Sequence, residues 1–149
     1  MFNAHRIVPN PVNEPVLSYA PGSPEREAVK QALEELGSDT KDLTSVINGE
    51  RVTSDETKPV SSPHDHKKQI GTLHRANAEH IQTAIDGCLA AKESWAAVPF
   101  EERAGIFLKA ADLLAGRYRA RLNAATMMGQ SKTCHQAEID SACELIDFW

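Results

Sequence analysis

The chain has 149 residues, of which 41% are hydrophobic and 25% charged, as in a soluble globular protein with one domain of ordinary size. The net charge of -5, without a basic stripe, argues against a nucleic-acid partner, and no apolar run approaches the ~20 residues of a membrane span. Three cysteines without C-x-x-C spacing argue against a disulfide framework and for a reducing compartment.

The first 22 residues contain four prolines, which lack a backbone donor and block helices. The sequence therefore predicts an extended arm over residues 1–22. Neither a secretory signal nor an Arg-rich mitochondrial presequence is visible in it. Apolar residues along the arm indicate that it docks on a surface. They are Ile7, Val8, Val12, Val16 and Leu17.

A first helix is predicted from Ser23 to Gly37. Ser23 can cap it, and Pro24 suits the first helical position. Residues 44–75 follow with the features of β structure. The pair Asn48-Gly49 predicts a tight hairpin, because both residues tolerate positive φ. Further short strands are predicted at Lys58–Val60 and Gln69–Leu73, separated by a turn over Pro63–His66.

From Asn77 onward the pattern is helical, with Asn77 as the cap. Pro99 breaks the pattern, Gly116 interrupts it, and Gly129 is predicted to close a helix. A last helix follows and is still apolar and periodic at Trp149, so we expect the chain to be the beginning of something larger.

Four carboxylates lie on the last predicted helix: Glu138, Asp140, Glu144 and Asp147. Glu144 follows Asp140 by one turn and shares its face. Acidic runs on helices are mostly solvated faces, and we interpret this one so. Spacing alone does not make Glu144 a ligand-binding residue.

Other candidate sites are weaker. Gly129–Thr133 lacks the glycine before its lysine and the preceding strand of a phosphate-binding loop, so it is interpreted as a connector between helices. The group His64–His66 offers metal ligands but has no second cluster to complete a zinc site, which favours a solvated turn. Cys134 lies at a helix start, where a thiol pKa can fall, yet nothing supplies an oxyanion hole. Packing is therefore favoured for Cys134, and also for Cys88 and Cys143.

Several blocks together resemble the N-terminal part of the aldehyde dehydrogenase superfamily. They are Ile47–Glu50, Val60–Pro63, Gly71–Ala76, Ala84–Trp95, Glu101–Arg103 and Lys109–Leu114. Further blocks are similar to those members that oxidise L-glutamate γ-semialdehyde. They are Val12–Leu17, Gly22–Arg26, Gly129-Gln130, Lys132-Thr133, Gln136–Asp140 and Glu144–Phe148.

The resemblance implies an α/β parent with an NAD domain, a catalytic domain and an oligomerisation flap, of which this chain is a mostly α-helical piece. Residues 23–149 would be an incomplete NAD-binding domain behind the arm at residues 1–22 and the strands around residues 44–75. The implied reaction is attack of a Cys thiolate on the semialdehyde, hydride transfer to NAD, and release of glutamate by water. The resemblance further implies the mitochondrial matrix, proline catabolism and a dimer-based homo-oligomer, with no nucleic-acid or membrane partner.

The family's catalytic cysteine, general base, oxyanion asparagine and nucleotide-binding motifs have no counterpart here. The resemblance therefore implies no catalytic, cofactor-binding or metal residue in this chain. One position carries over: Glu144 would contact the amino-acid end of the substrate, as a carboxylate facing an ammonium group. Two hypotheses follow. The chain is an inactive piece of an NAD-dependent dehydrogenase, or it is a truncated interaction module that docks on full-length subunits.

Overall fold

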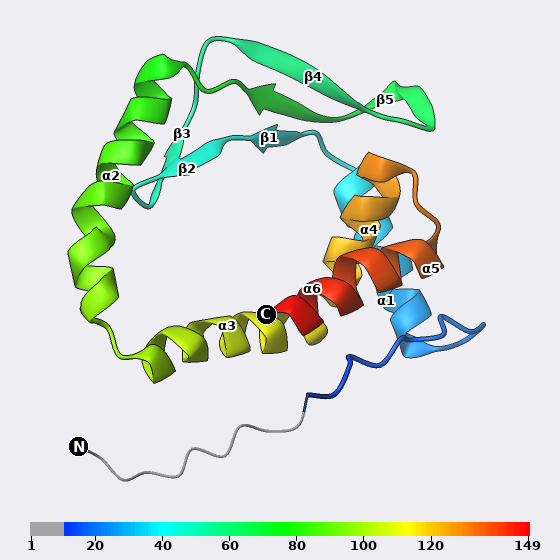
Figure 1. The fold of residues 1–149 in the computed structure, drawn as a ribbon. Coiled ribbons are helices and arrows are strands. Elements are labelled where there is room, and N and C mark those ends of the chain that lie inside the picture. The colour runs from blue at the N-terminus through cyan, green and yellow to red at the C-terminus, as the bar shows by residue number, and fades with distance from the viewer. Residues whose placement is uncertain (1–10) are drawn as a thin grey trace, which may run out of the picture.

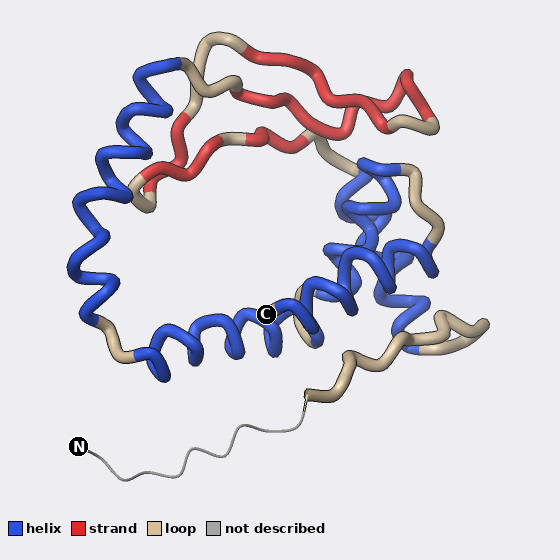
Figure 2. Tube along the Cα trace, viewed as in Figure 1, coloured by secondary structure: helices blue, strands red, loops and turns tan. Residues whose placement is uncertain are grey.

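The structure, a computed structural model, describes residues 11–149 and arranges its elements around an open ring (Figure 1). The helices are α1 (Pro24–Gly37), α2 (Ala78–Ala97), α3 (Phe100–Ala115), α4 (Arg119–Gln130), α5 (Cys134–Ala137) and α6 (Glu144–Phe148), with a π-helical segment η1 (Glu138–Cys143) between the last two. The strands are β1 (Lys41–Leu43), β2 (Ser45–Ile47), β3 (Glu50–Val52), β4 (Thr57–Ser62) and β5 (Asp65–His74). The expected mixture of mostly helix with a few short strands is confirmed (Figure 2).

The start of the described chain agrees with the sequence. Residues 11–20 contain no helix or strand, while residues 1–10 of the predicted arm, including Ile7 and Val8, lie outside the described residues. Ser23 caps α1, since its side chain accepts a hydrogen bond from the backbone N–H of Arg26. The arm therefore leads directly into a well-defined first helix.

The strands form a two-stranded and a three-stranded sheet. The β2–β3 hairpin is confirmed, with φ values of 53° at Asn48 and 86° at Gly49. Strand β1 was not predicted, and it pairs in parallel with β5. At the contact between them, a Cβ on Gly71 would lie 2.9 Å from Leu43 Cδ1 and 3.2 Å from the Lys41 carbonyl oxygen, so glycine permits this close pairing.

Two predicted boundaries are wrong. The turn between β4 and β5 covers only Pro63 and His64, because Asp65 already pairs with Ser62 in the antiparallel ladder. Helix α4 continues through Gly129 and ends at Gln130. Ser131 takes the left-handed conformation that glycine usually supplies, with φ 57°, and its Oγ lies 2.8 Å from His64 Nδ1.

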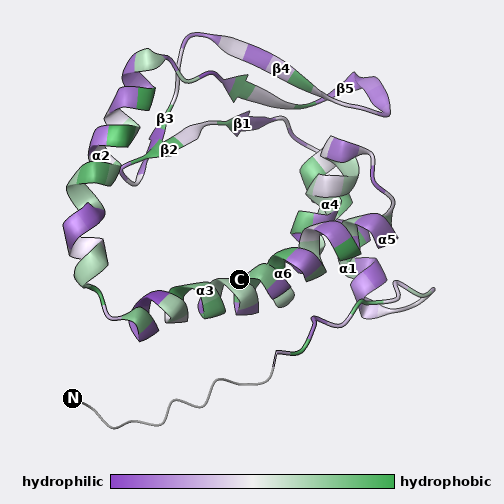
Figure 3. Cartoon of the chain, viewed as in Figure 1, coloured by the Kyte–Doolittle hydropathy of each residue, from purple (hydrophilic) through white to green (hydrophobic). Residues whose placement is uncertain are grey.

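The buried core lies between the arm, α1 and α4. Tyr19, Val29, Ala32 and Ala124 form it, and Leu33 and Leu36 of α1 pack against it. Helix α2 contributes no buried residue, although it carries the green apolar bands seen in Figure 3. Within residues 11–149, no helix is long and apolar enough to cross a membrane.

Candidate functional site

A polar cluster is buried where the arm crosses α4 and η1, and Glu138 is its centre. Glu138 is fully buried, so its interpretation as part of a solvated acidic face is wrong. Its Oε1 accepts from the backbone N–H of Leu17 at 2.8 Å. Its Oε2 accepts from the Tyr19 hydroxyl at 2.7 Å and from Asn123 Nδ2 at 2.8 Å. Each partner stands at least 15 residues away in sequence, so helical spacing gave no sign of the cluster.

Arg119 places a positive charge between two carboxylates. Its side chain is 8% exposed, and its Nε lies 3.2 Å from both oxygens of Glu138. The same guanidinium pairs with Glu14 and donates to the carbonyl oxygen of Pro15 at 2.7 Å. A buried charge is tolerated only when it is paired and hydrogen-bonded, and this arginine meets both conditions. The cluster thus ties the arm to α4 and η1.

The cluster sets the protonation of its members. Burial raises the pKa of Glu138, but the hydrogen bonds from Arg119, Leu17, Tyr19 and Asn123 lower it more, and the net pKa lies below the usual value. Burial, and then the hydrogen bond to Glu138 and its charge, raise the pKa of Tyr19. The carboxylate is therefore ionised at neutral pH and the phenol is protonated, which is the pairing that lets Tyr19 donate.

We expect the stability contributed by Glu138 to disappear in acid. Because its folded pKa is depressed, that stability is present above the unfolded pKa of about 4.3 and is lost as the pH falls through the folded pKa. Urea unfolding of the 149-residue chain should show Glu138→Gln costing most at pH 7 and progressively less below about pH 4. A cost that stays constant down to pH 3 would contradict this assignment, since the variant cannot titrate at residue 138.

The helix that carries the carboxylates is wound as a π-helix over η1. The backbone N–H of Glu144 donates to the carbonyl of Ile139, five residues earlier. This spacing puts Cys143 on the side of Glu138, with Cys143 Sγ 3.8 Å from Glu138 Oε1 and 3.4 Å from Arg119 Nη2. Single π turns inside helices are frequent at functional sites, and nothing in the sequence pattern indicated this one.

Glu144 itself lies outside the cluster. It is exposed, and among the described residues its carboxylate has no hydrogen-bond or ion-pair partner. Asp140 pairs at 2.6 Å with Lys132, and both are only partly exposed. Asp147 Oδ1 accepts from the backbone N–H of Glu14 at 2.7 Å, which brings the arm onto α6 as well. The four carboxylates therefore separate into Glu138, which is buried, and three more accessible groups.

Two of the three cysteines, Cys134 and Cys143, are at least partly buried and behave as packing residues. Burial raises the pKa of Cys134, and the charge of Glu138 raises it further. Burial also raises the pKa of Cys143, again with the charge of Glu138 as the next cause. A protonated thiol is a poor nucleophile, which agrees with the predicted packing roles. Cys88 is exposed on α2, so the packing role predicted for it is not found among the described residues, because α2 buries none of its side chains.

Two motifs singled out in the sequence have structural roles. The predicted connector between helices is present but shorter than Gly129–Thr133, because Gly129 and Gln130 belong to α4, and Thr133 caps α5. His64 contacts Ser62 and Ser131, and Ser62 donates to the Met128 carbonyl at 2.9 Å, so this turn fastens the β4–β5 hairpin to the end of α4. Within residues 11–149, no three His, Cys, Asp or Glu side chains gather as a metal site would need.

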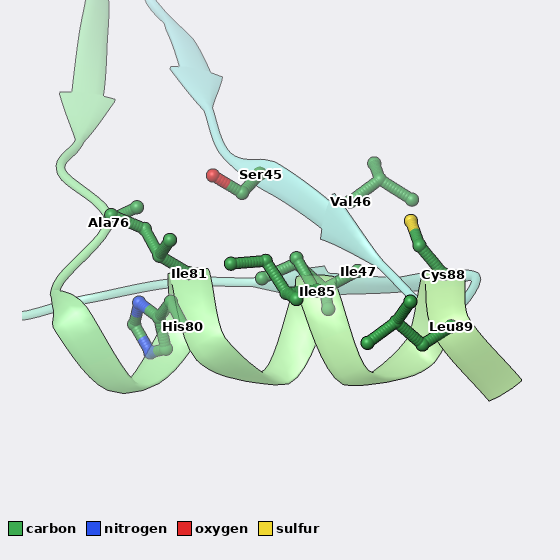
Figure 4. Close-up of a pocket in the computed structure, with 10 residues that line it drawn as sticks. Ser45, Val46, Ile47, Ala76, His80, Ile81, Ile85, Cys88 and Leu89 are labelled. Atoms are coloured by element: carbon green, nitrogen blue, oxygen red, sulfur yellow. The ribbon is translucent and has the colours of Figure 1, made fainter.

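A groove runs along α2 beside β2 (Figure 4). Its lining is mostly apolar, with Ile81, Ile85 and Leu89 of α2 between 47% and 62% exposed. The polar side chains in the lining are Ser45 and His80, which do not form a cradle for a dinucleotide. The groove is an uncovered, mostly apolar face of α2.

Comparison with known proteins places these features in a family. The family model of the aldehyde dehydrogenases ("Aldehyde dehydrogenase family") matches residues 51–149. The chain is 47% identical over 143 residues to delta-1-pyrroline-5-carboxylate dehydrogenase of Agaricus bisporus, covering 95% of this chain and 26% of that protein. It is 43% identical over 137 residues to the human mitochondrial enzyme of that name, covering 92% of this chain and 24% of the relative.

A solved structure gives the same result in three dimensions. The crystal structure of delta-pyrroline-5-carboxylate dehydrogenase from Mycobacterium tuberculosis, bound with NAD and cobalamin, superposes with a TM-score of 0.95 at 49% identity. It covers 100% of this chain and 28% of the solved chain. The chain therefore spans about a quarter of the length of the relatives it matches.

Proposed function

The chain belongs to the aldehyde dehydrogenase family, and from this we propose that the complete protein oxidises L-glutamate γ-semialdehyde to L-glutamate with NAD, as a step of proline catabolism. The strongest support is the TM-score of 0.95 over the whole chain to an enzyme named for the cyclic form of this semialdehyde and bound with NAD. NAD accepts a hydride in such reactions. We expect the groups for that step to lie in the rest of the complete protein.

Within that enzyme, the chain would supply the arm at residues 1–22 and the first part of the NAD-binding domain at residues 23–149. Glu144 would contact the substrate, because an exposed carboxylate without a partner is suited to an ammonium group. We further propose a homo-oligomer in the mitochondrial matrix, supported by the word mitochondrial in the names of several relatives. The uncovered apolar face of α2 would pack against the remaining three quarters of the fold.

The test is to assay the complete protein and the 149-residue chain for NADH formation with glutamate semialdehyde. We expect turnover by the complete protein and none by the chain alone, since by resemblance the family's catalytic cysteine has no counterpart in this chain. Turnover by the chain would overturn its proposed inactivity, and failure of the complete protein to use this semialdehyde would overturn the substrate. Stoichiometric co-purification of the chain with complete subunits would favour the second function, an interaction module.

A further inference from the structure

Three residues before and after Glu144 in the sequence contact the buried cluster or the arm, whereas Glu144 itself contacts neither. Glu138, six residues before it, receives the backbone N–H of Leu17 at 2.8 Å. Cys143, directly before it, lies 3.4 Å from Arg119 Nη2. Asp147, three residues after it, receives the backbone N–H of Glu14 at 2.7 Å. The helix is therefore held on both sides of an exposed carboxylate.

The π turn is what puts these three contacts on one side. In a continuous α-helix, with about 100° per residue, Cys143 would lie about 140° around the axis from Glu138. In η1 the two side chains meet instead, with Cys143 Sγ 3.8 Å from Glu138 Oε1. Asp147 follows Cys143 by four residues of α-helix and so shares its side. Glu144, the next residue after Cys143, points about 100° away from the side held by the arm.

We propose that Glu138 is a positioning residue for Glu144: clamped by Arg119 and the arm, it fixes the winding of η1 and thereby the direction in which Glu144 meets the substrate. The inference rests on the proposed function, in which Glu144 binds the ammonium group of glutamate semialdehyde. A rotation of the helix by one residue would turn the carboxylate by about 100° and remove that contact. The arm thus determines selectivity for aldehydes that carry an amino-acid group.

The experiment uses the complete dehydrogenase and two aldehydes, glutamate semialdehyde and propanal, which has no ammonium group. For Glu138→Gln we expect the KM for the semialdehyde to rise about tenfold, the loss of one charge-assisted contact, while kcat and the KM for NAD stay within about twofold. The kinetic constants for propanal should not change. Asp140→Asn, on the same helix but outside the arm contacts, is the matched control and should leave both aldehydes unaffected.

Further variants separate the possible failures. Glu144→Gln alone tests the substrate contact. If it leaves the semialdehyde KM unchanged, the proposed contact between Glu144 and the substrate is wrong. The positioning role is overturned if Glu144→Gln raises this KM and Glu138→Gln leaves it unchanged. It is also overturned if Glu138→Gln raises the KM for both aldehydes equally. The double variant Glu138→Gln/Glu144→Gln should raise the semialdehyde KM no more than Glu144→Gln does alone.

If Glu138→Gln does not fold, Asp147→Ala provides the test, since Asp147 is exposed and its loss removes the contact with the backbone of Glu14. Asp147→Ala should raise the semialdehyde KM selectively, and an unchanged KM would overturn the proposal.

Discussion

Replacing Arg119 with methionine should lower the free energy of unfolding of the 149-residue chain by about 3–5 kcal/mol. Methionine keeps much of the length of the side chain but removes the charge and every donor. Glu138, fully buried, would then keep the hydrogen bonds from Leu17, Tyr19 and Asn123 but would lose its only ion-pair partner among the described residues. Breaking a buried pair from one side is costly because the remaining charge has neither water nor a counterion.

Urea unfolding followed by circular dichroism measures this difference. Arg121→Met is the matched control, because Arg121 lies on the same helix and is exposed. That substitution should change the free energy of unfolding by no more than about 0.5 kcal/mol. If Arg119→Met costs no more than Arg121→Met, Arg119 does not stabilise the fold, and the ion pairs at its guanidinium make no net contribution.

The elements predicted correctly are those fixed by neighbours in the sequence. Ser23 caps α1, Asn77 caps α2, and Asn48-Gly49 turns the β2–β3 hairpin, each through contacts within about three residues. Strand β1 was missed because three residues carry no periodicity, and its strand character comes only from pairing with β5, about 30 residues later. Local signals are therefore enough for caps and tight turns but not for short strands.

The end of α4 also shows that local sequence signals do not determine an element boundary when a tertiary contact acts on it. Gly129 was the expected stop because glycine takes positive φ without strain. In the structure Ser131 takes that conformation, and its hydroxyl contacts His64 from a hairpin 67 residues earlier. A tertiary contact of this kind offsets the local preference and moves the boundary.

The candidate site could be predicted only in part. Glu144 was singled out by resemblance, and its role remains a prediction. Glu138 was assigned to a solvated face because acidic helix positions usually are solvated, and its partners at Leu17, Tyr19 and Arg119 come from two other segments. Nothing in the sequence pattern indicates that Arg119 is buried, and the structure shows this side chain in the interior. A buried arginine requires an anion, and Glu138 is that anion.

The double variant Arg119→Met/Glu138→Leu should recover most of the stability that Arg119→Met loses. Both charges leave the interior together, so no unpaired ion remains apart from Glu14, whose side chain is 20% exposed. We expect the free energy of unfolding lost in the double variant to be smaller than the sum of the two single losses by about 3 kcal/mol.

The same urea series measures this coupling when Glu138→Leu is added to it. Additive losses would mean that the two residues act separately, which contradicts their close pairing, in which Arg119 Nε lies 3.2 Å from both oxygens of Glu138. A stable double variant would separate stability from function: the apolar pair would hold the fold without fixing η1 through Glu138. In the complete enzyme such a variant should fold but discriminate poorly between glutamate semialdehyde and propanal, because two of the three contacts that orient Glu144, those of Glu138 with Leu17 and of Cys143 with Arg119, would be gone.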